Sequence, residues 1–397
     1  MRLPPQHLQR LDDFLRKATD EHGYLGAVAL IAQRGDIVAL RATGYRDLSR
    51  RTPMGTDAIF RIYSMTKTIV TVAALQLVEE GRLALDAPVE KILPAFAAPR
   101  VLIGGGADAP QTRAATRAIT LRDLLTHTAG FANGPDTPLA AAELLRRTDL
   151  DRAASLDDYV ARLARVPLAR DPGVRFAYDG AGLEVASRMI EIACGESLDA
   201  CLRRRIFLPL EMRDTGFSVP QAQRARIVDL LSSDASGALV LADTRSAREP
   251  GALLKNYPSG AGGLYSTARD YARFAQMLVD GGALDGVRIL ERASVESMMR
   301  DQLHGAELPR GALQPGETFG LGGSIVIDPV ARSRPQAHGA FGWPGAASTY
   351  YTLDRDQGLV AILLLQYLPR NEGRDLPKIS TPFYNLVYQA FIPASHP

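Results

Sequence analysis

The stretch Tyr63-Ser-Met-Thr-Lys-Thr68 (YSMTKT) lies between an extended segment, AIFRI, and a long apolar run, IVTVAALQLVEEG. The apolar run predicts a helix of about 17 residues that begins at this stretch. The i, i+3 spacing places Ser64 and Lys67 on one face of its first turn. A serine hydroxyl is a weak nucleophile, and a lysine that has lost its proton can serve as its base. Ser64 also lies near the positive end of the helix dipole, where a developing oxyanion is stabilised.

The same pair also fits a purely structural interpretation, in which Ser64 caps the helix and Lys67 is a solvated side chain. The signature of α/β-hydrolases, Gly-x-Ser-x-Gly, does not occur in the sequence. His127, in LLTHTAGF, is a candidate for a triad base. An imidazole at a helix end more often satisfies backbone groups, which favours a structural role for His127.

Composition and charge favour a globular protein that acts on small molecules. The 397 residues are 46% hydrophobic and 23% charged, which suffices for two domains and a sizeable core. The formal net charge of +2 is spread along the chain, without the basic stripe of a nucleic-acid or membrane-surface partner. No signal-peptide pattern and no membrane-spanning stretch is visible, so we expect a cytoplasmic protein.

The cysteines and histidines give little support to a metal site. Cys194 and Cys201 are seven residues apart in a segment with a helical pattern, and we expect two buried apolar side chains without a disulfide. The six histidines show no metal-ligand spacing. The sequence therefore predicts neither a metal nor a cofactor.

Hydrophobic periodicity predicts regular elements at both ends of the chain. A helix is expected at 5–20, a hairpin from GAVALIAQ and DIVALRA, three strands from LGGSIVID, ASTYYTLD and GLVAILLLQ, and a helix from FYNLVYQAF. Residues from about 80 to 255 are mostly helical in pattern, and the Gly/Ala/Pro-rich stretch 103–118 is expected to be a surface loop. We therefore expect an α+β fold, with an antiparallel sheet flanked by helices (residues 1–80 and 255–397) and an inserted helical domain (81–254).

Five motifs in order along the chain resemble one known family. They are SMTK at 64–67, LLTHTAG at 124–130, FAYDGAG at 176–182, YPSGAGGLYST at 257–267 and GWPGAASTYYTLD at 342–354. Together they resemble the penicillin-recognising serine hydrolases related to class C β-lactamases, and most closely the family VIII carboxylesterases. The resemblance covers essentially the whole chain. It implies a β-lactamase/transpeptidase-like fold with the active site in the cleft between the two domains.

Carried over by position, the resemblance implies a role for several residues. Ser64 matches the acylated nucleophile and Lys67 its proton partner, while Tyr178 matches the tyrosine of a Tyr-x-Asn motif that passes the proton to the leaving group. Because a free phenol titrates at about 10, this role requires the neighbouring ammonium to favour the ionised form, so lysine and tyrosine would titrate as a coupled pair. The backbone N–H groups of Ser64 and Ala346 are expected to form the oxyanion hole.

Two departures from the lactamase pattern favour neutral esters. The third position of Tyr-x-Asn is Gly180, and Trp343-Pro344-Gly345 replaces the Lys-Thr-Gly triplet. We expect Trp343 and Gly345 to bind substrate, with the indole as an apolar wall that carries one N–H donor. An apolar wall suits an acyl ester better than an anionic β-lactam.

The sequence thus predicts a serine carboxylesterase that hydrolyses short-chain acyl esters through an acyl-serine intermediate. Three alternatives stay open: an acyltransferase on the same scaffold, a β-lactamase or D,D-peptidase, and a catalytically silent binding protein. The expected partner is a small-molecule ester, and the oligomeric state is not predicted.

Overall fold

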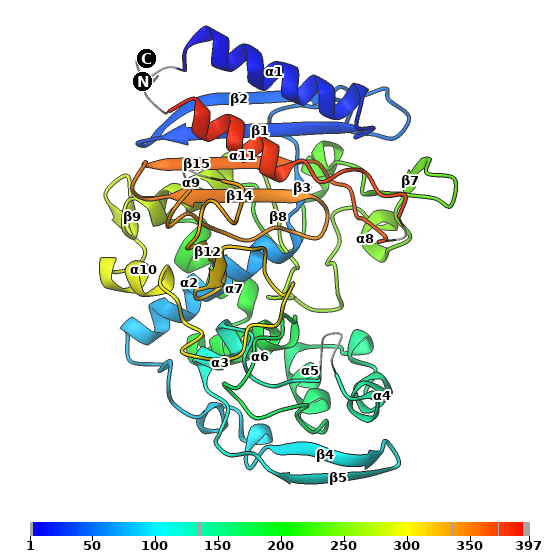
Figure 1. Cartoon of the computed structure of the whole chain (residues 1–397), viewed down its shortest axis with the longest axis vertical. Helices are drawn as coiled ribbons and strands as arrows, with labels where there is room; N and C mark the ends of the chain where they lie inside the picture. The colour runs from blue at the N-terminus through cyan, green and yellow to red at the C-terminus, as the bar shows by residue number, and fades with distance from the viewer. Residues whose placement is uncertain (1–2, 133–136, 335–336, 372, 392–397) are drawn as a thin grey trace.

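A seven-stranded antiparallel sheet forms the centre of the fold (Figure 1). The computed structural model describes residues 3–132, 137–334, 337–371 and 373–391. The strand order is β11-β12-β13-β14-β15-β1-β2. Their bounds are β1 (Gly26–Gln33), β2 (Asp36–Gly44), β11 (Glu317–Phe319), β12 (Ser324–Val326), β13 (Phe341–Gly342), β14 (Thr349–Asp354) and β15 (Leu359–Leu364). The two ends of the chain therefore build one sheet, in which β1 pairs with β15.

Alternating side chains along the strands divide the core into two layers. In β1, Val28 and Leu30 join one buried cluster, whereas Ala29 and Ile31 join the other. This alternation follows from the two-residue period of a strand. Helices α1 (Pro5–Asp20) and α11 (Ser380–Gln389) cover one face, and α9 (Ala268–Val279) packs on β1, β14 and β15 from the opposite layer.

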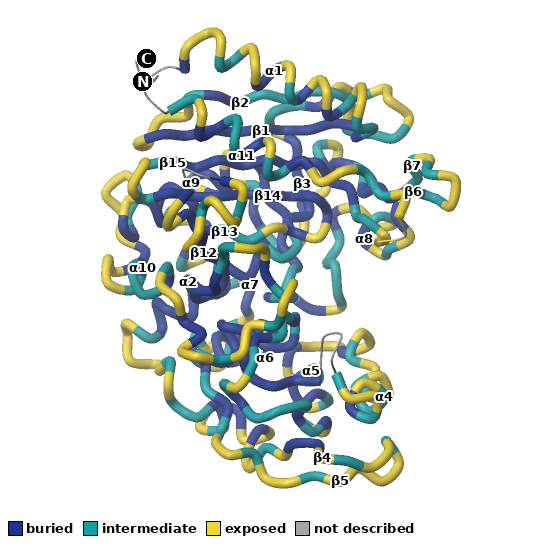
Figure 2. Tube along the Cα trace, in the orientation of Figure 1, coloured by how far each residue is buried: buried dark blue, intermediate teal, exposed yellow. Residues whose placement is uncertain are grey.

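Helix α2 (Thr66–Glu79) is the central helix of the molecule. Its first twelve residues are all buried, which accounts for a sequence that is apolar on every side. It packs against α6 (Ala181–Cys194) and shares a core cluster with the inner face of the sheet. Figure 2 shows this part of the chain as buried, in contrast to the exposed outer side of α1. The first turn of α2, which carries Lys67, is therefore packed on all sides.

The remaining elements are mostly helices with small hairpins. The helices are α3 (Leu121–Leu125), α4 (Leu139–Arg147), α5 (Leu156–Leu163), α7 (Leu198–Leu202), α8 (Arg245–Arg248) and α10 (Arg292–Met298). The two-stranded pairs are β3 (Phe60–Arg61) with β8 (Tyr265–Ser266), β4 (Arg100–Gly106) with β5 (Ala109–Ala114), β6 (Leu231–Ser233) with β7 (Leu239–Leu241), and β9 (Ala283–Leu284) with β10 (Val287–Arg288). Helices α3 to α6 lie below the sheet in Figure 1.

Most predicted elements at the two ends of the chain are confirmed, and so is the α+β class with an antiparallel sheet. The helix after YSMTKT is shorter than expected, because Tyr63–Met65 forms a separate 3-10 turn before α2. The domain boundaries at 80/81 and 254/255 stay a prediction.

The expected surface loop at 103–118 is wrong for most of its length. Strands β4 and β5 form a hairpin there, with Gly105 at a φ of 77° and a register shift between Leu102 and Gly104. Pairing uses backbone groups, so a Gly- and Ala-rich composition does not prevent it. Val101 and Leu102 anchor the hairpin in the core.

The expectation that the cysteines stay unpaired is also wrong. A disulfide joins Cys194 and Cys201, whose Cα atoms lie 6.2 Å apart. The two residues do not share one helix, because Gly195 ends α6 in a left-handed conformation and the chain reverses into α7. The reversal brings the second cysteine back to the first, which the linear spacing could not reveal.

Candidate active site

Ser64 lies in the 3-10 turn Tyr63–Met65 that leads directly into α2. Tyr63 has a φ of 44°, a left-handed conformation that is uncommon for a bulky residue. Strained backbone of this kind tends to occur at functional sites. The turn places the Ser64 hydroxyl at the amino end of α2, where the helix dipole favours negative charge.

Two side chains from different parts of the chain contact the Ser64 hydroxyl. Lys67 Nζ donates a hydrogen bond to Ser64 Oγ at 3.0 Å, and the Tyr178 hydroxyl donates one at 2.7 Å. Lys67 lies in the first turn of α2, three residues after Ser64, as the i, i+3 spacing predicted. Tyr178 lies 114 residues further along the chain. The structure therefore brings together the three residues that the sequence singled out.

Lys67 is held in place by a second hydrogen bond. Its side chain is buried, and Nζ also donates to the Ala261 carbonyl oxygen at 2.5 Å. The ammonium lies 5.0 Å from the centre of the Tyr178 ring. No carboxylate in the described part of the chain forms an ion pair with Lys67. Lys67 Nζ is thus held between a backbone carbonyl and the serine hydroxyl.

Trp343 extends the hydrogen-bonded chain by one member. Its indole Nε1 donates to the Tyr178 hydroxyl oxygen at 3.0 Å, and the two ring centroids lie 4.9 Å apart. Phe319 packs edge-on against the indole at 5.1 Å. We expected this N–H to face a substrate, whereas the structure directs it at the tyrosine. The indole can still offer its half-buried ring as a wall.

His127 has the structural role that the sequence favoured. It is buried, and its Nδ1 accepts a hydrogen bond from the backbone N–H of Asp179 at 3.3 Å. Burial lowers the pKa of His127 below its usual value, so the ring is neutral near pH 7. Its ring packs against the Tyr178 ring at a tilt, with centroids 4.6 Å apart. His127 therefore helps to hold the Tyr178 ring in place.

Glu184 is a buried carboxylate that sequence reasoning missed. It accepts hydrogen bonds from the Ser259 hydroxyl and, at 3.1 Å, from the Gly260 N–H, while Lys255 Nζ lies 3.6 Å away. Burial raises the pKa of Glu184, and the Lys255 cation opposes that rise. These contacts hold the segment whose Ala261 carbonyl orients Lys67. A single charged residue inside the apolar stretch AGLEVAS was the signal that could have revealed it.

The segment 343–346 approaches the serine from the sheet. A Cβ on Gly345 would lie 2.3 Å from the Ile62 carbonyl oxygen, so only glycine allows this segment to lie against the strand that precedes Ser64. The Gly345 N–H donates to Thr349 O at 2.7 Å. The backbone N–H of Ala346 donates to no group among the described residues and belongs to an exposed residue. The role of this N–H in an oxyanion hole stays a prediction.

Gly180, which replaces the asparagine of Tyr-x-Asn, lies at the start of α6. A Cβ at this position would lie 3.3 Å from the Ala261 side chain. The missing side chain thus lets the segment that orients Lys67 approach α6 closely.

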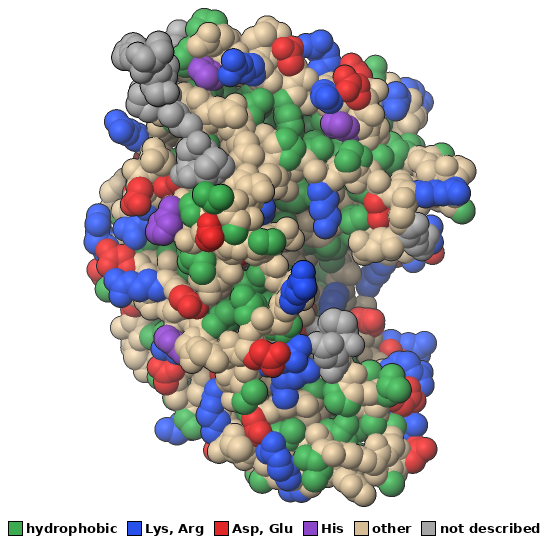
Figure 3. Space-filling view, viewed as in Figure 1, with side chains coloured by type: hydrophobic (Ala, Val, Ile, Leu, Met, Phe, Trp, Pro, Cys, Tyr) green, Lys and Arg blue, Asp and Glu red, His purple; other side chains and the backbone are tan. Residues whose placement is uncertain are grey.

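Figure 3 shows the molecular surface hollowed on the right-hand side of the face in view, between the parts that carry α8 and α4.

Comparison with known proteins identifies the family. The beta-lactamase family model matches residues 11–379. The chain belongs to the beta-lactamase family. Among curated proteins, Protein Rv1367c of Mycobacterium tuberculosis is 34% identical over 363 residues, with 89% of each chain covered. Esterase EstB of Burkholderia gladioli is 33% identical over 378 residues, again with 89% of each chain covered.

The fold is also shared with a solved structure. EstCE1, described as a hydrolase with promiscuous acyltransferase activity, superimposes with a TM-score of 0.76 at 25% identity. The match covers 96% of this chain and 97% of the other. These similarities confirm the β-lactamase-like serine hydrolase family and its esterase branch as the group that the motifs resemble.

Two further properties of this beta-lactamase family member bear on the expectations from sequence. No helix in the described ranges is long and apolar enough to cross a membrane. Cys194, Glu196 and Cys201 form one cluster of potential metal ligands. The disulfide occupies both sulfurs of that cluster, so it offers a single carboxylate to an ion.

Proposed function

We propose that this chain is a serine carboxylesterase that hydrolyses short-chain acyl esters through an acyl-Ser64 intermediate. One observation carries the proposal: the Ser64 hydroxyl is hydrogen-bonded at once to Lys67 Nζ (3.0 Å) and to the Tyr178 hydroxyl (2.7 Å). Among the described residues, no histidine is hydrogen-bonded to the Ser64 hydroxyl. An amine and a phenol can together supply the base that a triad histidine supplies elsewhere.

The proposed reaction runs in two steps. In the reactive form, either Lys67 or Tyr178 has lost its proton and accepts the one from Ser64 Oγ as that oxygen attacks the ester carbonyl. The same proton then passes to the leaving alkoxide, which departs as an alcohol. A water molecule next attacks the acyl-serine, releases the carboxylic acid and restores the serine.

Backbone and aromatic groups complete the proposed site. The N–H groups of Ser64 and Ala346 are proposed to bind the oxyanion, helped by the amino end of α2. Trp343 and Gly345 are proposed to contact the substrate, and the indole N–H supports Tyr178 when its oxygen becomes negative. No metal or cofactor enters this scheme.

The test is a panel of p-nitrophenyl esters of increasing acyl length beside a chromogenic cephalosporin, on the wild type and on Ser64→Ala. We expect rapid turnover of the acetate and butyrate esters, and a loss of several orders of magnitude in the variant. Mass spectrometry after treatment with a serine-directed phosphonate should locate the adduct on Ser64. An adduct on another serine, or a cephalosporin kcat/KM at or above that of the short esters, would overturn the assignment.

Acyl transfer is the second candidate, because EstCE1 is described as a hydrolase with promiscuous acyltransferase activity. An acyl-enzyme can be resolved by an alcohol as well as by water. Adding a primary alcohol to the butyrate assay and measuring the new ester against free butyrate decides between the two. Hydrolysis should dominate at low alcohol concentration if the esterase proposal holds.

A cytoplasmic location is kept as a proposal. Disulfides persist mainly in oxidising compartments, so the Cys194–Cys201 bond provides a direct test. Alkylation of free thiols in intact cells, followed by mass spectrometry, should find both cysteines reduced if the protein resides in the cytoplasm. A stable bond in cells would argue for another compartment.

A further inference from the structure

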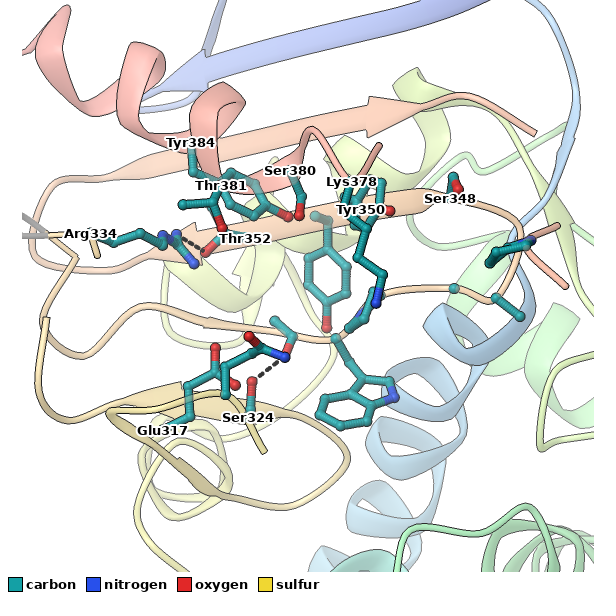
Figure 4. Close-up of a pocket in the computed structure, with 18 of the residues that line it drawn as sticks. Glu317, Ser324, Arg334, Ser348, Tyr350, Thr352, Lys378, Ser380, Thr381 and Tyr384 are labelled. Carbon is teal, nitrogen blue, oxygen red and sulfur yellow. Dashed lines mark hydrogen bonds between the residues drawn. The ribbon is translucent and has the colours of Figure 1, made fainter. Parts of the chain in front are cut away.

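A cavity of about 470 Å³ lies beside the candidate active site and shares the segment 343–346 with it. Its walls come from β12, β14, the segment 343–346 and the stretch that leads into α11 (Figure 4). Ser64, Lys67 and Tyr178 are not among its lining residues. Its size is typical of small-molecule sites, which range from about 300 to 1,000 Å³.

Arg334 lies at one end of this cavity as a buried cation without an anion. Its exposed fraction is only 4%, and its Nε has no hydrogen-bond partner. One Nη donates to Thr352 Oγ1 at 3.2 Å, and the guanidinium lies 4.2 Å from the centre of the Tyr384 ring. No carboxylate in the described ranges forms an ion pair with it. A buried charge with this environment is costly unless a partner anion arrives.

The neighbouring Arg332 lines the same cavity and, in contrast to Arg334, forms an ion pair. Its Nε donates to the Glu317 carboxylate at 2.6 Å, and both side chains are largely buried. Of the two carboxylates in the lining, Glu317 is paired with Arg332 and Asp375 accepts a hydrogen bond from the Tyr367 hydroxyl, and neither forms an ion pair with Arg334. Lys378, an exposed residue of the lining, adds a further positive charge.

The remaining walls are suited to an apolar or aromatic body. Tyr350, from β14, and Tyr384, from α11, are both buried residues of the lining. Tyrosine rings supply large apolar contact area together with polar tips. A ligand with one anionic group and a ring would match both the charge and the walls.

We propose that this cavity binds a small aromatic carboxylate, with its carboxylate paired to Arg334 and its ring against Tyr350 and Tyr384. The guanidinium suits this group because its fork of N–H donors matches the two oxygens of a carboxylate. The segment 343–346 lines the cavity and also carries Trp343, whose N–H reaches Tyr178. A ligand in the cavity would therefore also contact this segment, from a site whose lining does not include Ser64.

Binding is tested by calorimetry with 4-phenylbutyrate and its uncharged amide, 4-phenylbutanamide. The protein is the full-length Ser64→Ala variant, so the result does not depend on ester hydrolysis. We expect the carboxylate to bind at least about tenfold more tightly than the amide, because a buried charged hydrogen bond is lost in the amide. Butyrate, which has the charge but no ring, should bind more weakly than 4-phenylbutyrate.

Two matched substitutions show which cation binds the carboxylate of the ligand. Arg334→Met keeps an unbranched side chain and removes its charge, and should reduce the affinity for 4-phenylbutyrate to that for the amide. Lys378→Met should change it less than about threefold, because an exposed charge contributes little. Equal affinity for acid and amide, an unchanged affinity in Arg334→Met, or a loss found only in Lys378→Met would each overturn the proposal.

A measurement on unsubstituted protein covers the case in which Arg334→Met does not fold. A crystal of the wild type soaked in 4-(4-bromophenyl)butyrate locates the ligand by the anomalous signal of bromine. The proposal requires bromine beside Tyr350 and Tyr384 and the carboxylate on Arg334. Density only at Ser64, or no density at a concentration that saturates the calorimetric signal, would refute it.

Discussion

Replacing Trp343 with phenylalanine separates two roles of the indole, because phenylalanine keeps an aromatic ring and lacks the N–H donor. In the structure this N–H donates to the Tyr178 hydroxyl at 3.0 Å, and the rings stack with centroids 4.9 Å apart. When the tyrosine gives up its proton during turnover, its oxygen becomes negative and the hydrogen bond becomes charge-assisted. A hydrogen bond to a charged group contributes about 1.5–3 kcal/mol.

This contribution sets the size of the expected effect. Since about 1.4 kcal/mol of barrier corresponds to a factor of ten in rate, Trp343→Phe should lower kcat/KM for p-nitrophenyl butyrate by about 10- to 150-fold. Most of the loss should appear in kcat, because the N–H contacts the tyrosine and not the substrate. The assay is initial-rate kinetics, with the melting temperature as a check on folding.

Tyr178→Phe provides the matched control, because it removes the acceptor of the same hydrogen bond. In that background, Trp343→Phe should change the residual rate by less than about threefold. Trp343→Ala also removes the wall, so it should be slower than Trp343→Phe while a phosphonate still labels Ser64. If Trp343→Phe has the same effect with and without the tyrosine hydroxyl, the indole acts through its shape and the reasoning about the N–H is wrong.

Further substitutions test the proton path, a carboxylate that positions Lys67, and a buried acid elsewhere in the fold. Lys67→Ala and Tyr178→Phe should each lower kcat by about a thousandfold, and the double variant should be little slower than either, because the two share one proton. Glu184→Gln should lower kcat and the rate of phosphonate labelling by about tenfold with little change in KM, because the carboxylate positions the loop that orients Lys67. Asp270→Asn tests a pH effect: burial raises the pKa of Asp270 from 3.8 to about 6. Between these values the folded protein holds a proton that the unfolded chain has released, so the wild type loses stability as pH rises through this window. Relative to the variant, the loss should reach about 3 kcal/mol at pH 7 by chemical denaturation.

Each of these expectations has a clear contrary result. Multiplicative losses in the Lys67/Tyr178 double variant would show two independent roles. A lower melting temperature with unchanged kcat in Glu184→Gln would show that the carboxylate only stabilises the fold. A stability difference that stays constant from pH 4 to 7 would show that Asp270 does not titrate as its burial implies.

The sequence was most informative where a contact depends on local periodicity. A helix places residues i and i+3 on one face, so the Ser64–Lys67 hydrogen bond could be expected from four consecutive residues. Short apolar runs bounded by turn signals indicated the strands β1, β14 and β15, which the sheet confirms. Tyr178 was identified by its motif, because no local rule connects it to a serine 114 residues away.

Tertiary structure alone decided the contacts between segments that are distant in sequence. The indole N–H of Trp343 meets Tyr178 across 165 residues. Glu184 contacts Ser259 because α6 packs against the loop that carries Ser259, and no sequence pattern relates these two segments. Composition was misleading at 103–118, where backbone pairing forms a hairpin, and at the cysteines, where a chain reversal brings the sulfurs together. Arg334 was one of many arginines in the sequence, and only packing shows that it is buried without a carboxylate. Periodicity records which neighbours a residue has along one element, whereas burial and pairing depend on what the rest of the chain places against it.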